Sequence, residues 1–262
     1  MRVAALAACG KALIAIAVTV ALFPLQLMVR MVSSGPASFV LPQLWHRALC
    51  RTLAIDVEQA GAIDTRAGTI YVGNHISHFD IFAVGACVRA AFIAKGEMSA
   101  WPGMKWLGAM QQTLFVSRRA RDAAKVAATV REAIGRGTRL VLFAEGTTSA
   151  GTTVAPFRSS LFEVLADPAP PRVESRLQPL TLELADADGR PVGSGGERDL
   201  YAFYGGTPAG AHVWRFLRSR GARVRITFHA PIDATHTMTR KELAHAAHAA
   251  VKSALGSRPS RA

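Results

Sequence analysis

The stretch GNHISHFDIF, residues 73–82, gathers two histidines and a carboxylate between apolar residues. His75 and Asp80 lie five residues apart, a separation that a loop and the first turn of a helix can close. In that arrangement Asp80 would hold one ring nitrogen of His75 and stabilise the imidazolium that forms when His75 takes up a proton. The pair therefore predicts a general base that could activate a substrate hydroxyl.

Two other interpretations of this stretch remain open on spacing alone. His75, His78 and Asp80 could supply part of a zinc or iron site, although no further ligand lies nearby and no H-E-x-x-H pattern occurs. Alternatively, Asn74 or Ser77 caps a helix and the histidines are incidental. The chain contains no G-x-S-x-G sequence, so direct transfer to an acceptor hydroxyl fits better than a covalent enzyme intermediate.

The elements that must position this pair follow from the hydrophobic pattern of the rest of the chain. Apolar, β-rich runs predict strands within 68–75, 90–97, 112–119, 139–147, 177–184 and 222–232. Helical spacing predicts helices over 80–89, about 121–137 and about 239–255, the last with Leu243, Ala247, Ala250 and Leu255 on one face. Strands that alternate with helices predict an α/β fold, a largely parallel sheet covered by helices. Chemistry in such sheets lies at the carboxyl ends of strands, where residues 73–82 and the stretch FAEGTTS (143–149) both fall.

The N-terminal segment favours a membrane partner. Residues 12–29 are apolar for eighteen positions between Lys11 and Arg30, which is long enough to span a bilayer. We expect a membrane anchor that spans the bilayer or lies in its interface; a cleaved signal peptide or a buried core helix would give a similar pattern. The expected division is a membrane-associated helical segment over 1–44 and an α/β domain over 45–262.

Charge and cysteine content limit the binding partners and the kinds of site that we expect. The chain has 31 Lys and Arg against 18 Asp and Glu, a net charge of +13, which suits an anionic lipid surface beside a membrane anchor. Nucleic acid is not expected, because only 7% of residues are aromatic and no zinc knuckle or helix-turn-helix signature accompanies the arginines. The three cysteines are too few and too far apart for a disulfide framework or a CxxC metal site.

NHISHFD (74–80) resembles the NHxxxxD motif of the glycerolipid acyltransferase family, whose best-known members are the 1-acylglycerol-3-phosphate acyltransferases. FAEGTTS resembles the FPEGTRS motif of the same family, about seventy residues further along. Residues 93–119 and 177–182 resemble two further blocks, so the resemblance covers roughly residues 45–232. The pair of motifs in a strand-to-helix context carries the resemblance.

The resemblance implies transfer of a fatty acyl group from coenzyme A or acyl carrier protein to the hydroxyl of a lysolipid, on the cytoplasmic face of the cell inner membrane. His75 would be the base and Asp80 its partner, and no metal or redox cofactor would be needed. The acceptor head group would lie near the turn formed by Glu145, Gly146, Thr147 and Thr148. Backbone amides of the loops, Lys95 or Lys105 are the candidate donors to the oxyanion.

One departure from the family pattern concerns the acceptor. Thr148 stands where the family usually has an arginine after EGT, and a threonine brings no charge to a phosphate. Arg118, Arg119 or Arg158 could supply that charge instead. We expect lysophosphatidate as the acceptor because that activity is the commonest in the family; lyso-ornithine lipid is the alternative, since residues 145–162 and 204–232 resemble a branch that acts on it. A non-catalytic, membrane-associated lipid-binding protein is the alternative of another class.

Overall fold

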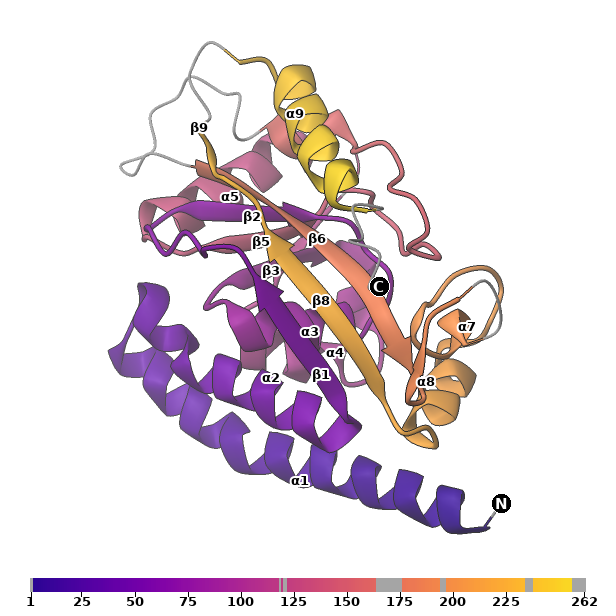
Figure 1. Ribbon diagram of the computed structural model, residues 1–262. Helices are drawn as coiled ribbons and strands as arrows, with labels where there is room; N and C mark the ends of the chain where they lie inside the picture. Colours follow the sequence, from indigo (N-terminus) through magenta and orange to yellow (C-terminus); the bar gives the residue numbers. More distant parts are fainter. Residues whose placement is uncertain are drawn as a thin grey trace.

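The computed structural model describes residues 2–117, 119, 122–163, 176–193, 197–233 and 238–255 (Figure 1). Its helices are α1 (Arg2–Val32), α2 (Val40–Leu53), α3 (Asp80–Cys87), α4 (Met104–Gln111), α5 (Ala123–Gly135), α7 (Arg198–Tyr201), α8 (Ala209–Leu217) and α9 (Arg240–Ala254), with the 3-10 turns η1 (Gly35–Phe39), η2 (Gly96–Ala100) and η4 (Ser159–Phe162). Its strands are β1 (Ile55–Ala60), β2 (Thr69–Gly73), β3 (Ala91–Lys95), β4 (Leu114–Val116), β5 (Leu140–Phe143), β6 (Arg176–Ala187), β7 (Arg190–Pro191), β8 (Ala222–Phe228) and β9 (Ile232–Asp233).

The strands form one sheet in the order β1-β8-β6-β2-β5-β3-β4, and β7 and β9 pair with β6 outside that order. Neighbours along the order pair in parallel except β6 and β8, which are antiparallel. The predicted fold, a largely parallel sheet covered by helices, is confirmed. β1 and the reversal at β8 were not predicted, and buried and less buried residues alternate along β8, as expected for a strand with one face toward solvent.

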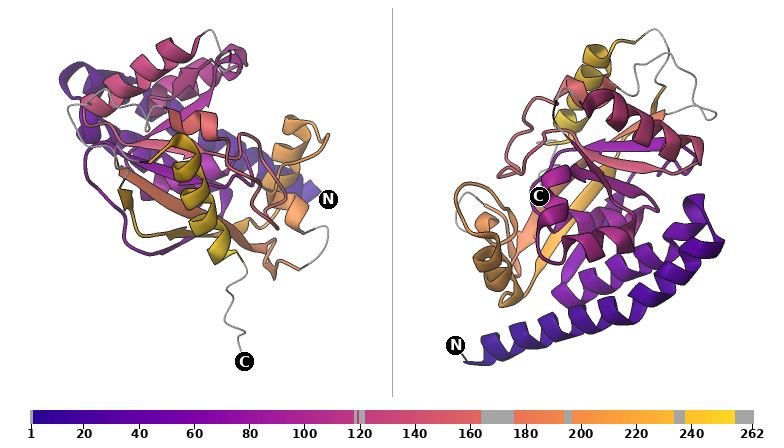
Figure 2. Two further views of the ribbon diagram at one scale, coloured as in Figure 1. Left: turned by 90° about the horizontal axis from the view of Figure 1, so that it is seen from above. Right: turned by 180° about the vertical axis from the view of Figure 1, so that it is seen from behind.

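Alternate residues of the central strands build two cores. Tyr71 of β2 packs in one core with residues of α2, α3 and α8. Its neighbours Ile70 and Val72 point to the other face and pack with residues of α5 and α9. Helices therefore cover both faces, and the views in Figure 2 show them on either side of the sheet. Both faces of β2 are therefore closed, and His75, two residues beyond its carboxyl end, is the first residue after the strand that is not fully buried.

The last helix packs through a slightly different face from the one predicted. The buried residues of α9 are Leu243, Ala244, Ala247 and Val251. Ala250 and Leu255, which were predicted on the same face, are half-buried, and Leu255 packs at the margin of the same core. The buried residues have the spacing i, i+1, i+4 and i+8, which gives a broad apolar face on a helix that lies flat on a sheet. The prediction had assumed a narrower apolar face.

Helix α1 lies against the rest of the molecule along its length, beside α2 (Figures 1 and 2). Part of its inner side packs on a third core formed by Trp45, Leu49 and Met110. Four hydrogen bonds at intervals along α1 join it to other elements: Lys11 Nζ to Ser219 O (2.9 Å), Trp45 Nε1 to Thr19 Oγ1 (2.9 Å), Gln26 Nε2 to Ser38 O (3.0 Å) and Arg30 Nη1 to Ala109 O (3.4 Å). The helix is therefore docked, and α2 continues through the expected boundary at residue 44.

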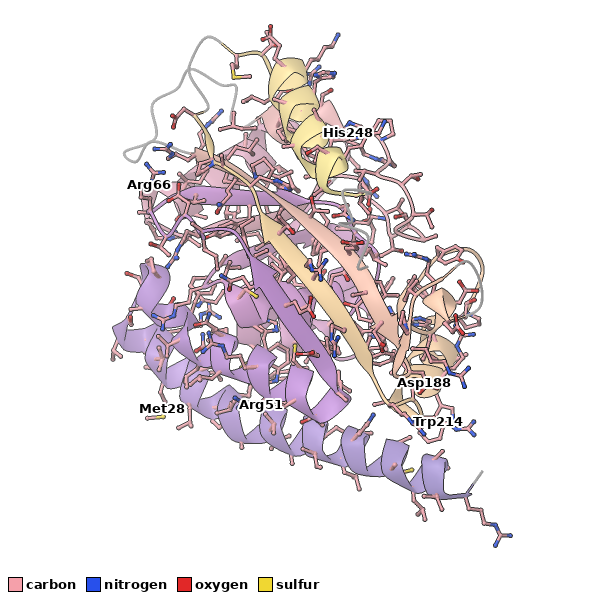
Figure 3. The ribbon with its side chains drawn as sticks, viewed as in Figure 1. Met28, Arg51, Arg66, Asp188, Trp214 and His248 are labelled. Atoms are coloured by element: carbon pink, nitrogen blue, oxygen red, sulfur yellow. The ribbon has the colours of Figure 1, made fainter. Side chains whose placement is uncertain are left out.

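The outer side of α1 is apolar and uncovered. Its mean hydropathy reaches 2.4 in the most apolar window, of which 6% is buried, so it has the length and composition of a membrane span or a signal sequence. Exposed apolar side chains run from Val3 to Val32, and Met28 points away from the other elements (Figure 3). The interpretation as a buried core helix is wrong. Such an uncovered apolar surface is consistent with membrane association.

Candidate functional site

Asn74, the residue after β2, holds the start of the site in place because its side-chain amide bonds to the backbone of β6. Asn74 donates from Nδ2 to Leu182 O (2.9 Å) and accepts at Oδ1 from Leu182 N (2.8 Å). The amide thus makes the pair of bonds that a backbone would make, and Gly73 before it allows this approach, because a Cβ there would lie 2.5 Å from Leu180. Asn74 is fully buried and caps no helix, so the suggested capping role for it is wrong.

The general-base pair that the sequence predicts is brought together. His75 Nδ1 lies 2.8 Å from Asp80 Oδ2. An ionised carboxylate can only accept, so Nδ1 carries the proton and the lone pair of Nε2 is left for a substrate. The His75 side chain is 17% exposed and Asp80 is fully buried. Among the described residues no hydrogen-bond partner of Nε2 is found.

Asp80 is held by the loop that precedes it. Its Oδ2 also accepts from the backbone N–H groups of Ile76 (2.6 Å) and Ser77 (2.9 Å), which curl around the carboxylate at the start of α3. No side chain caps α3 at its N-terminus, where Asp80 N and Phe82 N donate to the backbone carbonyls of Ser77 and Phe79. The suggested cap at Ser77 is therefore also wrong: its hydroxyl accepts only from Phe79 N (3.3 Å), outside the helix. Hydrogen bonds to a charged group are the strong ones, so the loop fixes the carboxylate that orients His75.

A tyrosine far along the chain completes the shell around Asp80. Tyr201, the last residue of α7, donates from its hydroxyl to Asp80 Oδ1 (3.0 Å). The ring is fully buried, and burial followed by the charge of Asp80 raises the pKa of Tyr201, which keeps the hydroxyl a donor. No motif pointed to Tyr201. The preceding Asp-Leu, part of a short helical turn, gave no signal that its tyrosine would reach a residue 121 positions away.

The second motif holds His75 from the other side. Phe143, the last residue of β5, stacks on the imidazole with ring centroids 4.0 Å apart and planes 1° apart. Glu145 accepts from the backbone N–H of His75 at Oε2 (2.7 Å) and from that of Ala155 at Oε1 (2.7 Å). Burial raises the pKa of Glu145, and those two backbone bonds lower it in part. Glu145 thus joins the His75 loop to two parts of its own loop, and its binding of the acceptor stays a prediction.

The turn after Glu145 lies against the His75 loop. Ser149 N donates to His75 O (2.8 Å), and Gly146 has a φ of +73°. A Cβ on Gly146 would approach Arg158 Nε to 2.8 Å, because Arg158 lies across the turn and donates to Glu145 O (3.3 Å). Thr147 is exposed and Thr148 half-buried. Arg158, which lies outside the 143–149 motif in sequence, therefore packs beside this turn.

The remaining predicted residues have different outcomes. Lys95 ends β3, which is the strand next to β5, so it lies at the same edge of the sheet as His75. Arg118 lies outside the described residues. Beyond β3 and β4, at this edge, a cavity of about 400 Å³ is lined by Ser117, Arg119 and Lys125 among others. Neither His75 nor Asp80 lines it.

His78 takes no part in the pair. Its ring lies among Phe79, Phe203 and His212, at centroid distances of 4.4, 4.9 and 5.0 Å. Burial, then the neighbouring His212, lowers the pKa of His78 to about 4. In the part of the chain that the structure describes, no three His, Cys, Asp or Glu side chains gather as metal ligands would. The arrangement can take a proton from a hydroxyl presented to Nε2.

Comparisons with known proteins point to one family. A family model described as Acyltransferase matches residues 54–179. A lyso-ornithine lipid O-acyltransferase of Rhodobacter capsulatus is 32% identical over 188 residues, 71% of this chain and 66% of that protein. One of Brucella abortus is 30% identical over 247 residues, 92% of this chain and 91% of that protein. A 1-acyl-sn-glycerol-3-phosphate acyltransferase of Neisseria meningitidis serogroup B is 29% identical over 177 residues, 67% of this chain and 65% of that protein.

A solved structure has the same fold. The 1-acyl-sn-glycerophosphate (LPA) acyltransferase PlsC from Thermotoga maritima superimposes with a TM-score of 0.66, covering 95% of this chain and 93% of that one. The two sequences are 20% identical, so this likeness concerns the fold alone.

Proposed function

The chain belongs to the glycerolipid acyltransferase family and is an O-acyltransferase with a lysolipid acceptor, and we propose that His75 is the general base of the transfer. The observation that carries the proposal is the His75–Asp80 pair, bonded through Nδ1 with Nε2 left for a substrate. The acyl donor is the thioester of coenzyme A or acyl carrier protein. No metal or redox cofactor takes part in the proposed step.

The reaction begins when the acceptor hydroxyl donates to Nε2 of His75. As the hydroxyl oxygen attacks the thioester carbonyl carbon, its proton passes to Nε2 and the ring becomes an imidazolium. Asp80 stabilises that cation through Nδ1–H, and the backbone amides of Ile76 and Ser77 hold the carboxylate in place. Phe143 and Glu145 keep the ring and its backbone from turning away.

The tetrahedral intermediate then breaks its carbon–sulfur bond. The sulfur leaves as a thiolate, with a thiol pKa near 8.5, and takes the proton from the imidazolium, which returns His75 to its starting state. The new ester bond joins the acyl group to the acceptor oxygen. Lys95 is the candidate donor to the oxyanion that forms in between, and Gly146 to Thr148 face the acceptor head group.

We infer that the acceptor is a lyso-ornithine lipid. Two relatives that match about nine-tenths of this chain, from Rhizobium meliloti and Brucella abortus, carry that name. Thr148 supports the assignment, because a neutral hydroxyl can bind a polar head group but brings neither the charge nor the bidentate fork that favours a phosphate. The charge that a phosphate needs is absent from this position.

Lysophosphatidate is the second candidate, and a different observation favours it. Arg158 lies across the Gly146 turn, and a guanidinium binds phosphate with a bidentate fork. A relative from Neisseria meningitidis named for this activity is 29% identical to the chain. Arg118 and Arg119 are further candidates for the same contact.

The docking of α1 supports one mode of membrane attachment. Hydrogen bonds from Lys11, in the first third of the helix, and from Arg30, in its last turn, join the helix to the α/β domain, and a helix that crossed the bilayer would lose most of them. We propose that α1 lies in the interface, with its uncovered side in the lipid, on the cytoplasmic face of the inner membrane. The acceptor then reaches His75 from the bilayer.

The acceptor is tested with the purified full chain in lipid vesicles. Lyso-ornithine lipid, lysophosphatidate and lysophosphatidylethanolamine are each offered with acyl-coenzyme A and with acyl carrier protein donors, and kcat/KM is measured. We expect lyso-ornithine lipid to give the highest value. A higher value for lysophosphatidate would favour the second candidate, and an Arg158→Gln variant would then lose it. Acylation of none of the three would contradict both.

A further inference from the structure

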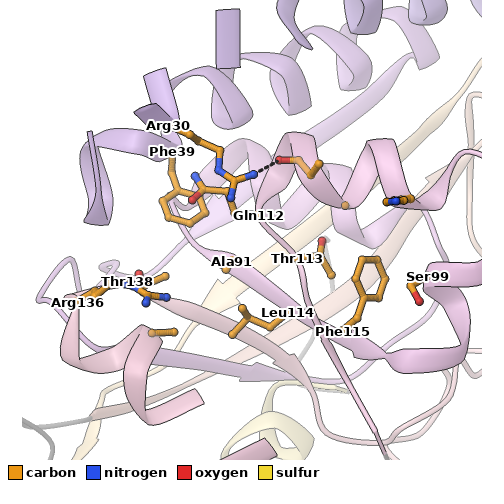
Figure 4. Close-up of a pocket in the computed structure, with 14 residues that line it drawn as sticks. Arg30, Phe39, Ala91, Ser99, Gln112, Thr113, Leu114, Phe115, Arg136 and Thr138 are labelled. Carbon is orange, nitrogen blue, oxygen red and sulfur yellow. Dashed lines mark hydrogen bonds between the residues drawn. The ribbon is translucent and has the colours of Figure 1, made fainter. Parts of the chain in front are cut away.

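The opposite edge of the sheet carries a cavity that the proposed reaction does not use. Its volume is about 330 Å³, and Ala91, Leu114 and Thr138 line it at the beginnings of β3, β4 and β5 (Figure 4). His75 follows the carboxyl end of β2, which runs parallel to β5. The four steps along β3 separate the two edges by about 13 Å. The cavity is therefore not part of the His75 site.

Three cations surround this cavity, which we call the basic cavity. Arg30, Lys105 and Arg136 all line it and all are exposed. No aspartate or glutamate is among the residues that line it in the described part of the chain. Gln112, Thr113 and Thr138 add an amide and two hydroxyls (Figure 4). A concave site with three positive charges and neutral donors suits an anion.

The cations retain most of their capacity to bind. Arg30 uses Nη1 to reach Ala109 O at 3.4 Å, one of the five N–H groups of its guanidinium. Lys105 has no ion-pair partner among the described residues. Arg136 pairs with the exposed Glu132 one helical turn away, a contact that water and a stronger anion can displace.

The basic cavity lies beside the surface that we place in the membrane. Arg30 is in the last turn of α1, where the uncovered apolar side ends. Next to Lys105, Trp106 is 65% exposed and packs edge-on against Phe23 of α1, with ring centroids 5.5 Å apart. Tryptophan gathers at the level of lipid head groups, and Arg and Lys at that depth meet the phosphates.

We propose that the basic cavity binds the phosphate of an anionic phospholipid head group, separately from the acyl acceptor. The phosphate contacts the guanidinium of Arg30 and the ammonium of Lys105, with Arg136 on the far side. The acyl chains of this lipid extend past Trp106 along the uncovered side of α1. A free anion would need no apolar surface beside its site, so the position next to Trp106 favours a lipid. The proposal rests on the interfacial placement of α1 and is independent of the role of His75.

The test measures binding of the full chain to phosphatidylcholine vesicles with and without one-fifth phosphatidylglycerol. The triple variant Arg30→Gln, Lys105→Gln, Arg136→Gln removes the cations of the cavity. A matched triple variant, Arg190→Gln, Lys241→Gln, Lys252→Gln, removes the same charge from exposed positions, two of them on α9 at the other end of the molecule (Figure 1). We expect the cavity variant to lose at least tenfold in affinity for the anionic vesicles, and the matched variant less than threefold.

A charge-preserving variant separates a site from a general attraction. Arg30→Lys keeps the positive charge but loses the bidentate fork, so we expect a loss of about threefold or more in affinity for phosphatidylglycerol vesicles. Soluble dihexanoyl phosphatidylglycerol, titrated into the protein in detergent, should bind the wild type, and an equal concentration of inorganic phosphate should not displace it. His75→Ala should bind the phosphatidylglycerol vesicles and the soluble phosphatidylglycerol as the wild type does, whatever its activity.

Three results would overturn the proposal. The first is equal loss in the two triple variants, and the second is wild-type affinity in Arg30→Lys. The third is displacement of dihexanoyl phosphatidylglycerol by an equal concentration of inorganic phosphate, which would mean a free-anion site. If α1 does not lie in the interface, the wild type will bind neither kind of vesicle, while acyl transfer in detergent will still report on His75.

Discussion

Tyr201 offers a precise test of how the pair at the site is held. Replacing it with phenylalanine removes one hydroxyl, which donates to Asp80 Oδ1 at 3.0 Å, and leaves the buried ring in place. A hydrogen bond to a charged group contributes about 1.5–3 kcal/mol. Asp80 is fully buried, so water cannot replace the donor. We expect the melting temperature to fall by about 3–12 °C, given about 2–4 °C for each kcal/mol in a chain of this size.

The activity of Tyr201→Phe should change in a way that lost stability alone does not explain. Without the hydroxyl, more of the negative charge of Asp80 is available to the imidazolium of His75. The fall in kcat/KM on acidification should then begin at a higher pH, by up to about one unit. The assay is the pH profile of acyl transfer in vesicles, at a temperature where both proteins are folded.

Tyr204→Phe is the matched control. Its hydroxyl also donates to a carboxylate, that of Asp199, but at the surface. We expect a change of stability below about 0.5 kcal/mol and an unchanged pH profile. A wild-type profile in Tyr201→Phe would refute the account of Asp80, and equal shifts in both variants would point to the 201–204 loop as a whole instead.

Three further changes test the surroundings of the pair. Asn74→Ala should lower the free energy of unfolding by about 2–4 kcal/mol in urea titrations, because both backbone groups of Leu182 lose a buried partner. Glu145→Gln should cost about 1–3 kcal/mol in the same assay and reduce kcat, since its amide nitrogen must face a backbone N–H; an unchanged kcat would argue against a positioning role. The pKa of His78 is about 4 in the folded chain and about 6.5 in the unfolded chain, so the unfolded chain binds more protons between these two pH values. The protein therefore loses stability as the pH is lowered through this range. His78→Phe should reduce the loss between pH 7 and pH 5 by about 1–2 kcal/mol, and an equal loss in both proteins would contradict the assignment.

The local hydrophobic pattern of the sequence was enough to predict the strands that are buried on both faces. β2 and β5 are short runs of β-branched and other apolar residues, and the polar motifs follow at their ends, so strand, turn and site could all be placed. β1 was missed because Asp56, Glu58 and Gln59 give it the composition of a surface loop. Its place in the sheet depends on pairing with β8, where Arg223 and Arg225 form ion pairs with Asp56 and Glu58.

The site was predicted where a contact is local and missed where it is not. His75 and Asp80 are five residues apart, so spacing alone suggested their bond. The backbone contacts of Glu145 were not predicted: its two oxygens accept the N–H groups of His75, 70 residues away, and of Ala155, ten residues along its own loop, while its contact with the acceptor stays a prediction. Tyr201 could not be found from sequence, because its bond to Asp80 depends on how the segment between β7 and β8 folds over α3.

The central claim is that His75, held by Asp80, takes the proton of the acceptor hydroxyl. The most direct measurement is kcat/KM for acyl transfer to lyso-ornithine lipid by His75→Ala and by His245→Ala, which removes an exposed histidine from α9. General-base catalysis contributes about 100- to 10,000-fold, so His75→Ala should lose at least about 100-fold while His245→Ala stays close to the wild type. A His75→Ala protein that is folded and transfers acyl groups within about tenfold of the wild-type rate would contradict the account.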